Sequence, residues 1–196
     1  MRPLVFHDTL AAALFWPGVA AWALGEAALG WRTRATRHVE SDRRTAGLLT
    51  ATVMVGVALG FVLAGNARWA ALPGGRWPAL VVGVALTWAG VLLRAWAIRT
   101  LGRFFQRTVM VHETHQVIDT GPYRAVRHPS YTGMLLITVG IGIALGNWLS
   151  VAACLAFPLI GLLTRIAVEE AVLERELGDP YRRYQARTHR LVPGVW

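Results

Sequence analysis

A hydrophobic segment of this chain follows the polar stretch Gly121-Pro-Tyr-Arg-Ala-Val-Arg-His-Pro-Ser-Tyr-Thr-Gly133. Pro129 suits the first turn of a helix and disfavours helical geometry at His128, so the pattern predicts a helix that begins at this proline. The loop before it would place Arg124, Arg127 and His128 at the N-terminus of that helix. Backbone N–H groups and the positive end of the helix dipole gather there, which favours a carboxylate or phosphate ligand.

The composition around this stretch is that of a membrane protein. The 196 residues are 55% hydrophobic, with a mean hydropathy of +0.43, which is too apolar for a soluble domain of this size. We therefore predict an all-α integral membrane protein with about five transmembrane helices. Hydropathy places these helices at Leu4–Leu29, Thr45–Ala64, Pro78–Ile98, Tyr131–Trp148 and Leu149–Val168.

The predicted helices divide one membrane domain, residues 1–196, into two parts. Residues 1–98 would form three N-terminal transmembrane helices, the first of them retained and not cleaved as a signal peptide, because its apolar run is long and leads into further spans. Residues 99–196 would form a catalytic half with a helical hairpin and a C-terminal tail. The cofactor pocket is expected in this half, on the cytosolic side.

The basic residues orient the predicted bundle. Most of them fall in the segments 30–44, 99–128 and 169–190, which this topology places on one side of the membrane. The positive-inside tendency then predicts a cytoplasmic site. Every basic residue other than histidine is arginine, which suggests a GC-rich genome, and we expect the inner membrane of a bacterium. With a pI near 11.3, these arginines indicate contacts with anionic membrane lipids and not with nucleic acid.

A second polar cluster lies where the fifth predicted helix leaves the membrane. Arg165 and Glu169 are four residues apart and therefore share a helical face. Their simplest interpretation is a salt bridge at a helix end. The adjacent Glu170 cannot share that face equally well, so we expect it to take another partner, such as Arg127, His128 or a bound cation.

The cysteine and histidine residues of the sequence do not indicate a metal site or a disulfide. The single cysteine, Cys154, lies in an apolar span, so no intrachain disulfide can form and a structural zinc cluster is not expected. His112 and His115 have a spacing that suits a metal but no obvious further ligand, and we predict no metal site. Arg94, near the end of the third predicted helix, could reach the membrane interface or point inward toward a substrate.

The order of these motifs resembles a known family. The polar stretch, a helical hairpin, Glu169-Glu170-x-x-Leu173, Gly178-x-x-Tyr181-x-x-Tyr184 and Arg190-Leu-x-Pro193 are similar to the isoprenylcysteine carboxyl methyltransferase family and related phospholipid methyltransferases. The resemblance covers roughly residues 101–196. It implies a helical membrane enzyme that binds S-adenosylmethionine between membrane and cytosol.

The resemblance also implies the site residues. Carried over by position, the cofactor-binding residues would be Tyr123, His128, Pro129, Tyr131, Gly133 and one or both of Glu169 and Glu170. We assign Glu170 to this set and add Arg127, because the loop places it at the N-terminus of the helix. His128 and the helix N-terminus suit the ligand carboxylate, Glu169 or Glu170 its amine, and Tyr123 or Tyr131 a ring or the sulfonium.

Arg165 and Glu169 are the predicted catalytic residues. If the acceptor is a carboxylate, it is already a nucleophile, and Arg165 would orient it. If it is a thiol or an amine, Glu169 would take its proton. The expected reaction is methylation of a lipophilic acceptor, foremost an isoprenylcysteine-like carboxylate. A phospholipid or small-thiol methyltransferase is the alternative, as is a non-catalytic membrane protein that binds or transports lipids.

Overall fold

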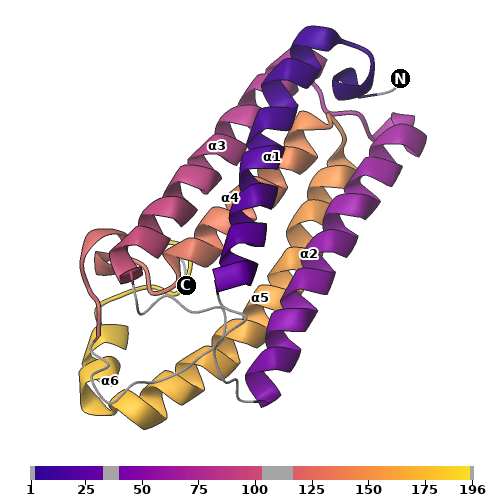
Figure 1. Cartoon of the computed structure of the whole chain (residues 1–196). Coiled ribbons are helices and arrows are strands. Elements are labelled where there is room, and N and C mark those ends of the chain that lie inside the picture. Colours follow the sequence, from indigo (N-terminus) through magenta and orange to yellow (C-terminus); the bar gives the residue numbers. More distant parts are fainter. Residues whose placement is uncertain (1–2, 33–39, 103–116, 195–196) are drawn as a thin grey trace.

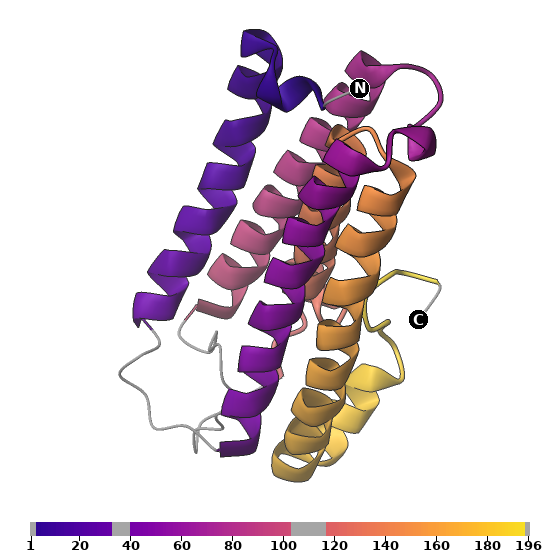
Figure 2. The same ribbon diagram turned by 90° about the vertical axis from the view of Figure 1, so that its right-hand side faces the viewer.

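The computed structural model describes residues 3–32, 40–102 and 117–194, which form a bundle of long helices (Figures 1 and 2). The helices are α1 (Thr9–Arg32), α2 (Glu40–Asn66), α3 (Arg76–Leu101), α4 (Pro129–Ala144), α5 (Trp148–Leu177) and α6 (Asp179–Gln185). Short 3₁₀ turns lie at Leu4–Phe6 (η1), Arg68–Ala70 (η2) and Gly121–Arg124 (η4). No β-strand occurs in these three described ranges, which agrees with the predicted all-α fold.

The predicted integral membrane character is confirmed by the lengths of the helices. Helices α1, α2, α3 and α5 are long and apolar enough to cross a membrane, and α4 is a shorter apolar helix. As expected, α4 and α5 form a hairpin, but α4 ends at Ala144 and not at Trp148 as predicted. The reason is local: Gly146 has a φ of 71°, and the Asn147 side chain accepts hydrogen bonds from two backbone N–H groups in the first turn of α5.

Glycines bring the helices into two close pairs. A Cβ atom on Gly90 of α3 would lie 2.5 Å from the carbonyl oxygen of Gly133 on α4. One on Gly56 of α2 would lie 2.9 Å from the carbonyl oxygen of Ala153 on α5. The backbones of α3 and α4, and those of α2 and α5, therefore touch directly, as small residues allow in membrane helices.

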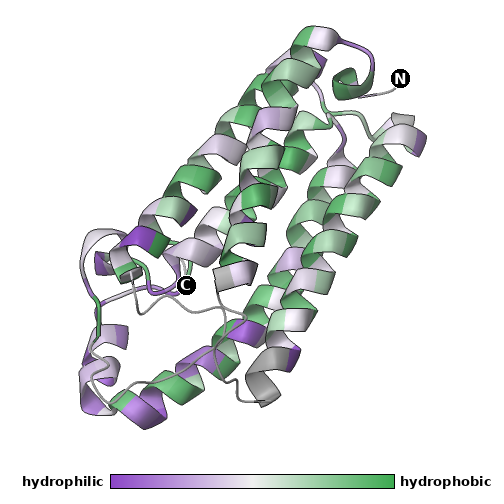
Figure 3. Cartoon of the chain, viewed as in Figure 1, coloured by the Kyte–Doolittle hydropathy of each residue, from purple (hydrophilic) through white to green (hydrophobic). Residues whose placement is uncertain are grey.

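The two ends of the bundle differ in character. The N-terminus and the short connections 67–75 and 145–147 lie at one end (Figure 1). The other end holds the loop before α4, the C-terminal turns of α5, and helix α6, and hydrophilic residues gather there (Figure 3). Helix α5 continues to Leu177, well beyond its predicted apolar span, and ends at Gly178 with a φ of 58°. This polar end carries the candidate site.

Candidate functional site

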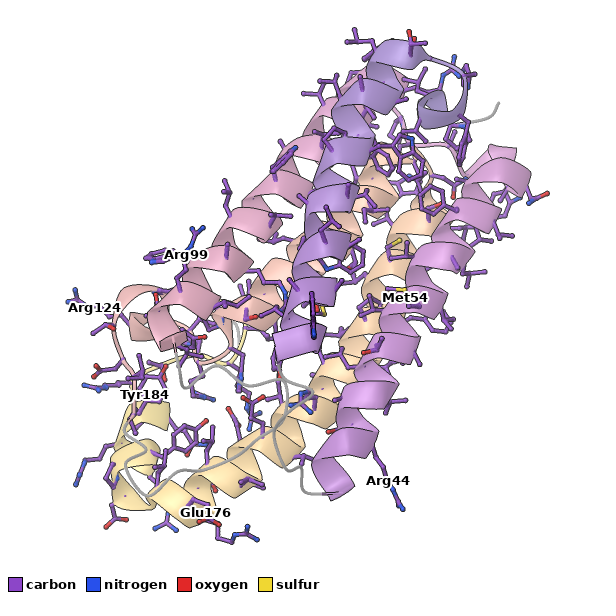
Figure 4. All side chains as sticks on the ribbon, viewed as in Figure 1. Arg44, Met54, Arg99, Arg124, Glu176 and Tyr184 are labelled. Carbon is purple, nitrogen blue, oxygen red and sulfur yellow. The ribbon has the colours of Figure 1, made fainter. Side chains whose placement is uncertain are left out.

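A pocket of about 340 Å³ opens among the helices toward the polar end. Its apolar lining comes from four helices: Trp22, Leu49, Val53, Met54, Leu101 and Met134. Its polar lining includes Glu26, Thr50, Arg94, Tyr123, Arg127, His128, Ser130, Tyr131, Arg165 and Glu169. Figure 4 shows Met54 midway along α2, with polar side chains gathered between it and the lower end of the bundle. The pocket is thus amphipathic.

Arg165 and Glu169 meet in this pocket through a third residue. The Tyr131 hydroxyl donates to Glu169 Oε2 at 2.7 Å and accepts from Arg165 Nε at 2.9 Å. Arg165 is 3% exposed, and its Nη1 also donates to the Thr45 hydroxyl on α2 at 3.1 Å. The Tyr131 ring stacks on the His128 ring, with centroids 5.5 Å apart. Tyr131 therefore links the two predicted catalytic residues.

Glu170 lies behind the pocket-lining group of Arg165, Tyr131 and Glu169. It is buried and does not line the pocket. Its carboxylate accepts hydrogen bonds from Arg127 Nε at 2.8 Å and Arg190 Nε at 2.9 Å, and lies 3.3 Å from His128 Nε2. Of the partners considered for this acid, the structure shows Arg127 and His128, and it adds Arg190, which was not predicted.

The C-terminal tail packs against the loop before α4. The N–H groups of Arg127 and His128 donate to the carbonyl oxygens of His189 and Arg190, at 2.7 and 3.0 Å. The Arg127 guanidinium also donates to the carbonyl oxygen of Thr188. The backbone of the loop just before α4 is therefore bonded to the tail.

Tyr123 joins the loop, the tail and the pocket. Its carbonyl oxygen accepts a hydrogen bond from the Tyr184 hydroxyl at 2.7 Å. Its own ring lines the pocket, and burial, with the nearby Glu169 carboxylate, raises the pKa of its phenol well above the usual value. Tyr123 therefore stays a neutral hydrogen-bonding group at physiological pH.

The sequence missed a polar cluster between α1, α3 and α4. Arg94 Nε donates to Glu26 Oε1 at 2.6 Å, and its Nη1 donates to the Ser130 hydroxyl at 2.6 Å. Of the two orientations considered for Arg94, the structure selects the inward one. A carboxylate such as Glu26 within an apolar span is costly without a partner, and this was the signal that could have found the cluster.

The predicted site residues separate into two groups. Six line the pocket: Tyr123, Arg127, His128, Tyr131, Arg165 and Glu169. Three do not: Pro129 is the buried first residue of α4, Gly133 packs against α3, and Glu170 binds the arginines behind the site. His112 and His115 lie outside the described residues, within which no group of three or more possible metal ligands occurs.

A sequence model of the isoprenylcysteine carboxyl methyltransferase family matches residues 82–175. This segment contains the loop before α4, the α4–α5 hairpin and the Arg165–Glu170 cluster. Over these residues, just under half of its length, the chain is similar to that family. The resemblance inferred from the motifs is thereby confirmed.

Named relatives agree with this family. A probable protein-S-isoprenylcysteine O-methyltransferase of Oryza sativa subsp. indica is 33% identical over 121 residues, which cover 61% of this chain and 63% of that protein. The protein-S-isoprenylcysteine O-methyltransferase B of Arabidopsis thaliana is 34% identical over 115 residues, 58% of each chain. This chain therefore spans less than two thirds of the length of either relative.

A solved structure shares the fold. The eukaryotic intramembrane Ras methyltransferase of this family aligns with a TM-score of 0.64 and 21% identity, covering 98% of this chain and 70% of that one. The likeness extends to the N-terminal helices, for which the sequence offered no resemblance. The family and the apolar helices together show an integral membrane protein.

Proposed function

We propose that this protein is a membrane methyltransferase that transfers a methyl group from S-adenosylmethionine to the carboxylate of an isoprenylcysteine-like acceptor. One observation carries the proposal: Arg165, Tyr131 and Glu169 form a linked group in a pocket that is also lined by apolar side chains of four helices. Such a pocket suits a hydrocarbon chain that ends in a charged reacting group. The names of the plant relatives support the same chemistry.

The polar lining fits the groups of S-adenosylmethionine. Glu169 would bind the amine of the ligand, and Arg127 with His128 would bind its carboxylate. The rings of Tyr123 and Tyr131 would contact the sulfonium or the adenine. Each of these side chains lines the pocket, which supports the proposal by giving every group of the cofactor a candidate partner.

The remaining predicted cofactor residues would support this set from behind. Glu170 is held by Arg127, His128 and Arg190, and we propose that it fixes the loop while Glu169 binds the ligand amine. Pro129 would fix the start of α4, and Gly133 would set its distance from α3.

The proposed reaction makes few demands on the protein. When bound, S-adenosylmethionine would supply an electrophilic methyl group. The bond between this methyl group and the sulfonium would break as the bond to the acceptor oxygen forms, giving a neutral methyl ester and S-adenosylhomocysteine. A carboxylate is already ionised at neutral pH, so no side chain needs to take a proton. Arg165 would hold the acceptor oxygen in line, and the apolar wall would exclude water, so that catalysis comes from orientation and desolvation.

We further propose that the protein lies in the inner membrane of a bacterium, with the polar end in the cytoplasm. The support for the cytoplasmic side is the gathering of arginines at that end of the bundle, where Arg44, Arg99 and Arg124 are found (Figure 4). Anionic lipid headgroups are the natural partners of these side chains.

Calorimetry on the detergent-purified protein tests the cofactor. The parent is expected to bind S-adenosylmethionine, and Glu169→Gln and His128→Ala are expected to bind it at least tenfold more weakly, because each loses a charge-assisted hydrogen bond. A folded parent that binds no S-adenosylmethionine would overturn the proposal in favour of a non-catalytic lipid-binding or transport protein.

Methyl transfer to farnesylcysteine analogues tests the reaction. Arg165→Ala should bind the cofactor like the parent but lose about a hundredfold or more in turnover, because the acceptor is no longer oriented. Unchanged turnover in both Arg165→Ala and Glu169→Gln would sink these assignments. Methylation of phosphatidylethanolamine or a small thiol, with none of the farnesylcysteine, would favour the alternative enzymes.

A further inference from the structure

Trp22 of α1 carries a buried donor that the fold leaves unused. Trp22 lines the pocket and is 7% exposed. Its indole N–H is buried and has no hydrogen-bond partner in the part of the chain that the structure describes. Buried polar groups are almost always paired, because an unpaired one loses its hydrogen bond to water without compensation. An oxygen of a bound ligand would supply the missing acceptor.

A second donor lies on the same wall. Trp22 and Glu26 are four residues apart on α1, so they share a helical face, and Glu26 binds Arg94. The hydrogen bonds of Arg94 within the described residues use its Nε and Nη1 atoms. A guanidinium carries two further N–H groups on Nη2. Arg94 lines the pocket, so these donors are available to a ligand there.

The charges on this wall select the ligand group. Glu26 already neutralises Arg94 at 2.6 Å, so a second carboxylate would meet a like charge. A neutral carbonyl oxygen accepts hydrogen bonds without that repulsion. In an isoprenylcysteine-like acceptor, the neutral carbonyl is that of the amide on the cysteine nitrogen, while the carboxylate is left to Arg165.

We propose that Trp22 and Arg94 form a subsite for the amide carbonyl of the acceptor. The proposal rests on the proposed function, and it adds a specificity that the family motifs do not contain, because Trp22 lies outside the matched segment. The subsite distinguishes acceptors that carry an amide on the carbon next to the carboxylate from those that carry only the carboxylate.

The test compares two ligands that differ in this amide. N-acetyl-S-farnesylcysteine carries it, and S-farnesyl-3-thiopropionate lacks it but keeps the chain and the carboxylate. Calorimetry should show that the parent binds the N-acetyl compound at least fivefold more tightly. Trp22→Phe keeps an aromatic ring and removes the donor, so the affinity for the N-acetyl compound should fall about five- to thirtyfold, with no change for the thiopropionate.

Two controls keep the result interpretable. Trp31→Phe changes an 80% exposed tryptophan of the same helix and should leave both affinities unchanged. Trp22→Phe should still unfold in a single cooperative transition, lowered only by the packing that the smaller ring loses, since no hydrogen bond within the described chain is lost.

The outcomes separate this proposal from the proposed function. Equal affinity of the parent for both ligands overturns the subsite, whatever the folding of the variant, and so does an equal loss for both in Trp22→Phe. An amide preference without methyl transfer would keep the subsite and overturn the enzymatic function. Methyl transfer without an amide preference would keep the enzymatic function and overturn the subsite. If the parent bound neither ligand, both the subsite and the proposed function would be overturned.

Discussion

Glu169 and Glu170 are neighbours on α5, and successive residues of a helix point roughly 100° apart. Glu169 therefore reaches the Tyr131 hydroxyl in the pocket, while Glu170 reaches Arg127 and Arg190 behind it. Two chemically identical side chains thus lie in different environments: Glu169 in the pocket and Glu170 in a buried cluster of charges. The two glutamates should respond differently to the same substitution.

Glu170→Gln should lower the free energy of unfolding by about 3 kcal/mol, because it leaves buried cationic partners without their counter-charge. Glu169→Gln should lower it by about 1 kcal/mol, since the amide oxygen can still accept from Tyr131. Detergent-based thermal or denaturant unfolding measures both. Equal destabilisation of the two variants would contradict the division between them.

The buried phenols outside the membrane helices predict an alkaline instability. Burial raises the pKa of Tyr123, Tyr181 and Tyr184 above the usual value of 10.0. Above pH 10 the unfolded chain loses these protons while the folded chain keeps them, so the free energy of unfolding falls as the pH rises. Below pH 10 both states are protonated and the effect vanishes.

Ultraviolet difference titration of tyrosinate checks this expectation. The folded protein should release these phenol protons only well above pH 10, and Tyr184→Phe should reduce the delayed signal by one residue. If the folded and the denaturant-unfolded protein titrate alike, the buried environment of these phenols is refuted.

At the scale of elements, the contact between α3 and α4 holds the loop and the pocket wall together. A Cβ atom on Gly90 would lie 2.5 Å from the Gly133 carbonyl oxygen, too close for the two backbones to stay in place. Gly90→Ala should therefore destabilise the protein by about 1–3 kcal/mol. The measurement is a thermal unfolding curve in detergent.

Gly25→Ala is the matched control on α1, because no atom lies within 4 Å of its added Cβ. Alanine is the better helix former, so this variant should be as stable as the parent or more stable by up to about 1 kcal/mol. A Gly90→Ala protein as stable as Gly25→Ala would show that α3 and α4 do not pack backbone to backbone.

At the scale of the whole molecule, the tail completes the site from the far end of the chain. Truncation after Gln185 removes the carbonyl groups that accept from Arg127 and His128. The affinity for S-adenosylmethionine should fall about 10- to 100-fold, because the loop loses its fixed position. Circular dichroism should show the helical bundle retained.

Removal of residues 193–196 alone is the control for this truncation. Pro193 and Gly194 are exposed, so the hydrogen bonds between loop and tail remain. The affinity should then equal that of the parent. A longer truncation that also binds like the parent would show that the tail does not position the loop.

Much of the fold was predictable, because the signals are local. Apolar runs of membrane length predicted the helices, and Pro129 predicted the start of α4. The predicted end of α4 was too late, because the turn at Gly146 and Asn147 ends the helix at Ala144. The hydropathy of a segment does not report where a capping side chain turns the chain.

The sequence by itself determined the membrane class, the helical hairpin and the family motifs. Only the tertiary structure decided that Glu26 pairs with Arg94 across 68 residues, that the tail bonds to the loop, and that Glu169 rather than Glu170 lines the pocket. The physical reason is the range of the forces. Helix periodicity and turn chemistry act between neighbours in the chain, whereas the partner of a buried charge is set by which helices pack side by side.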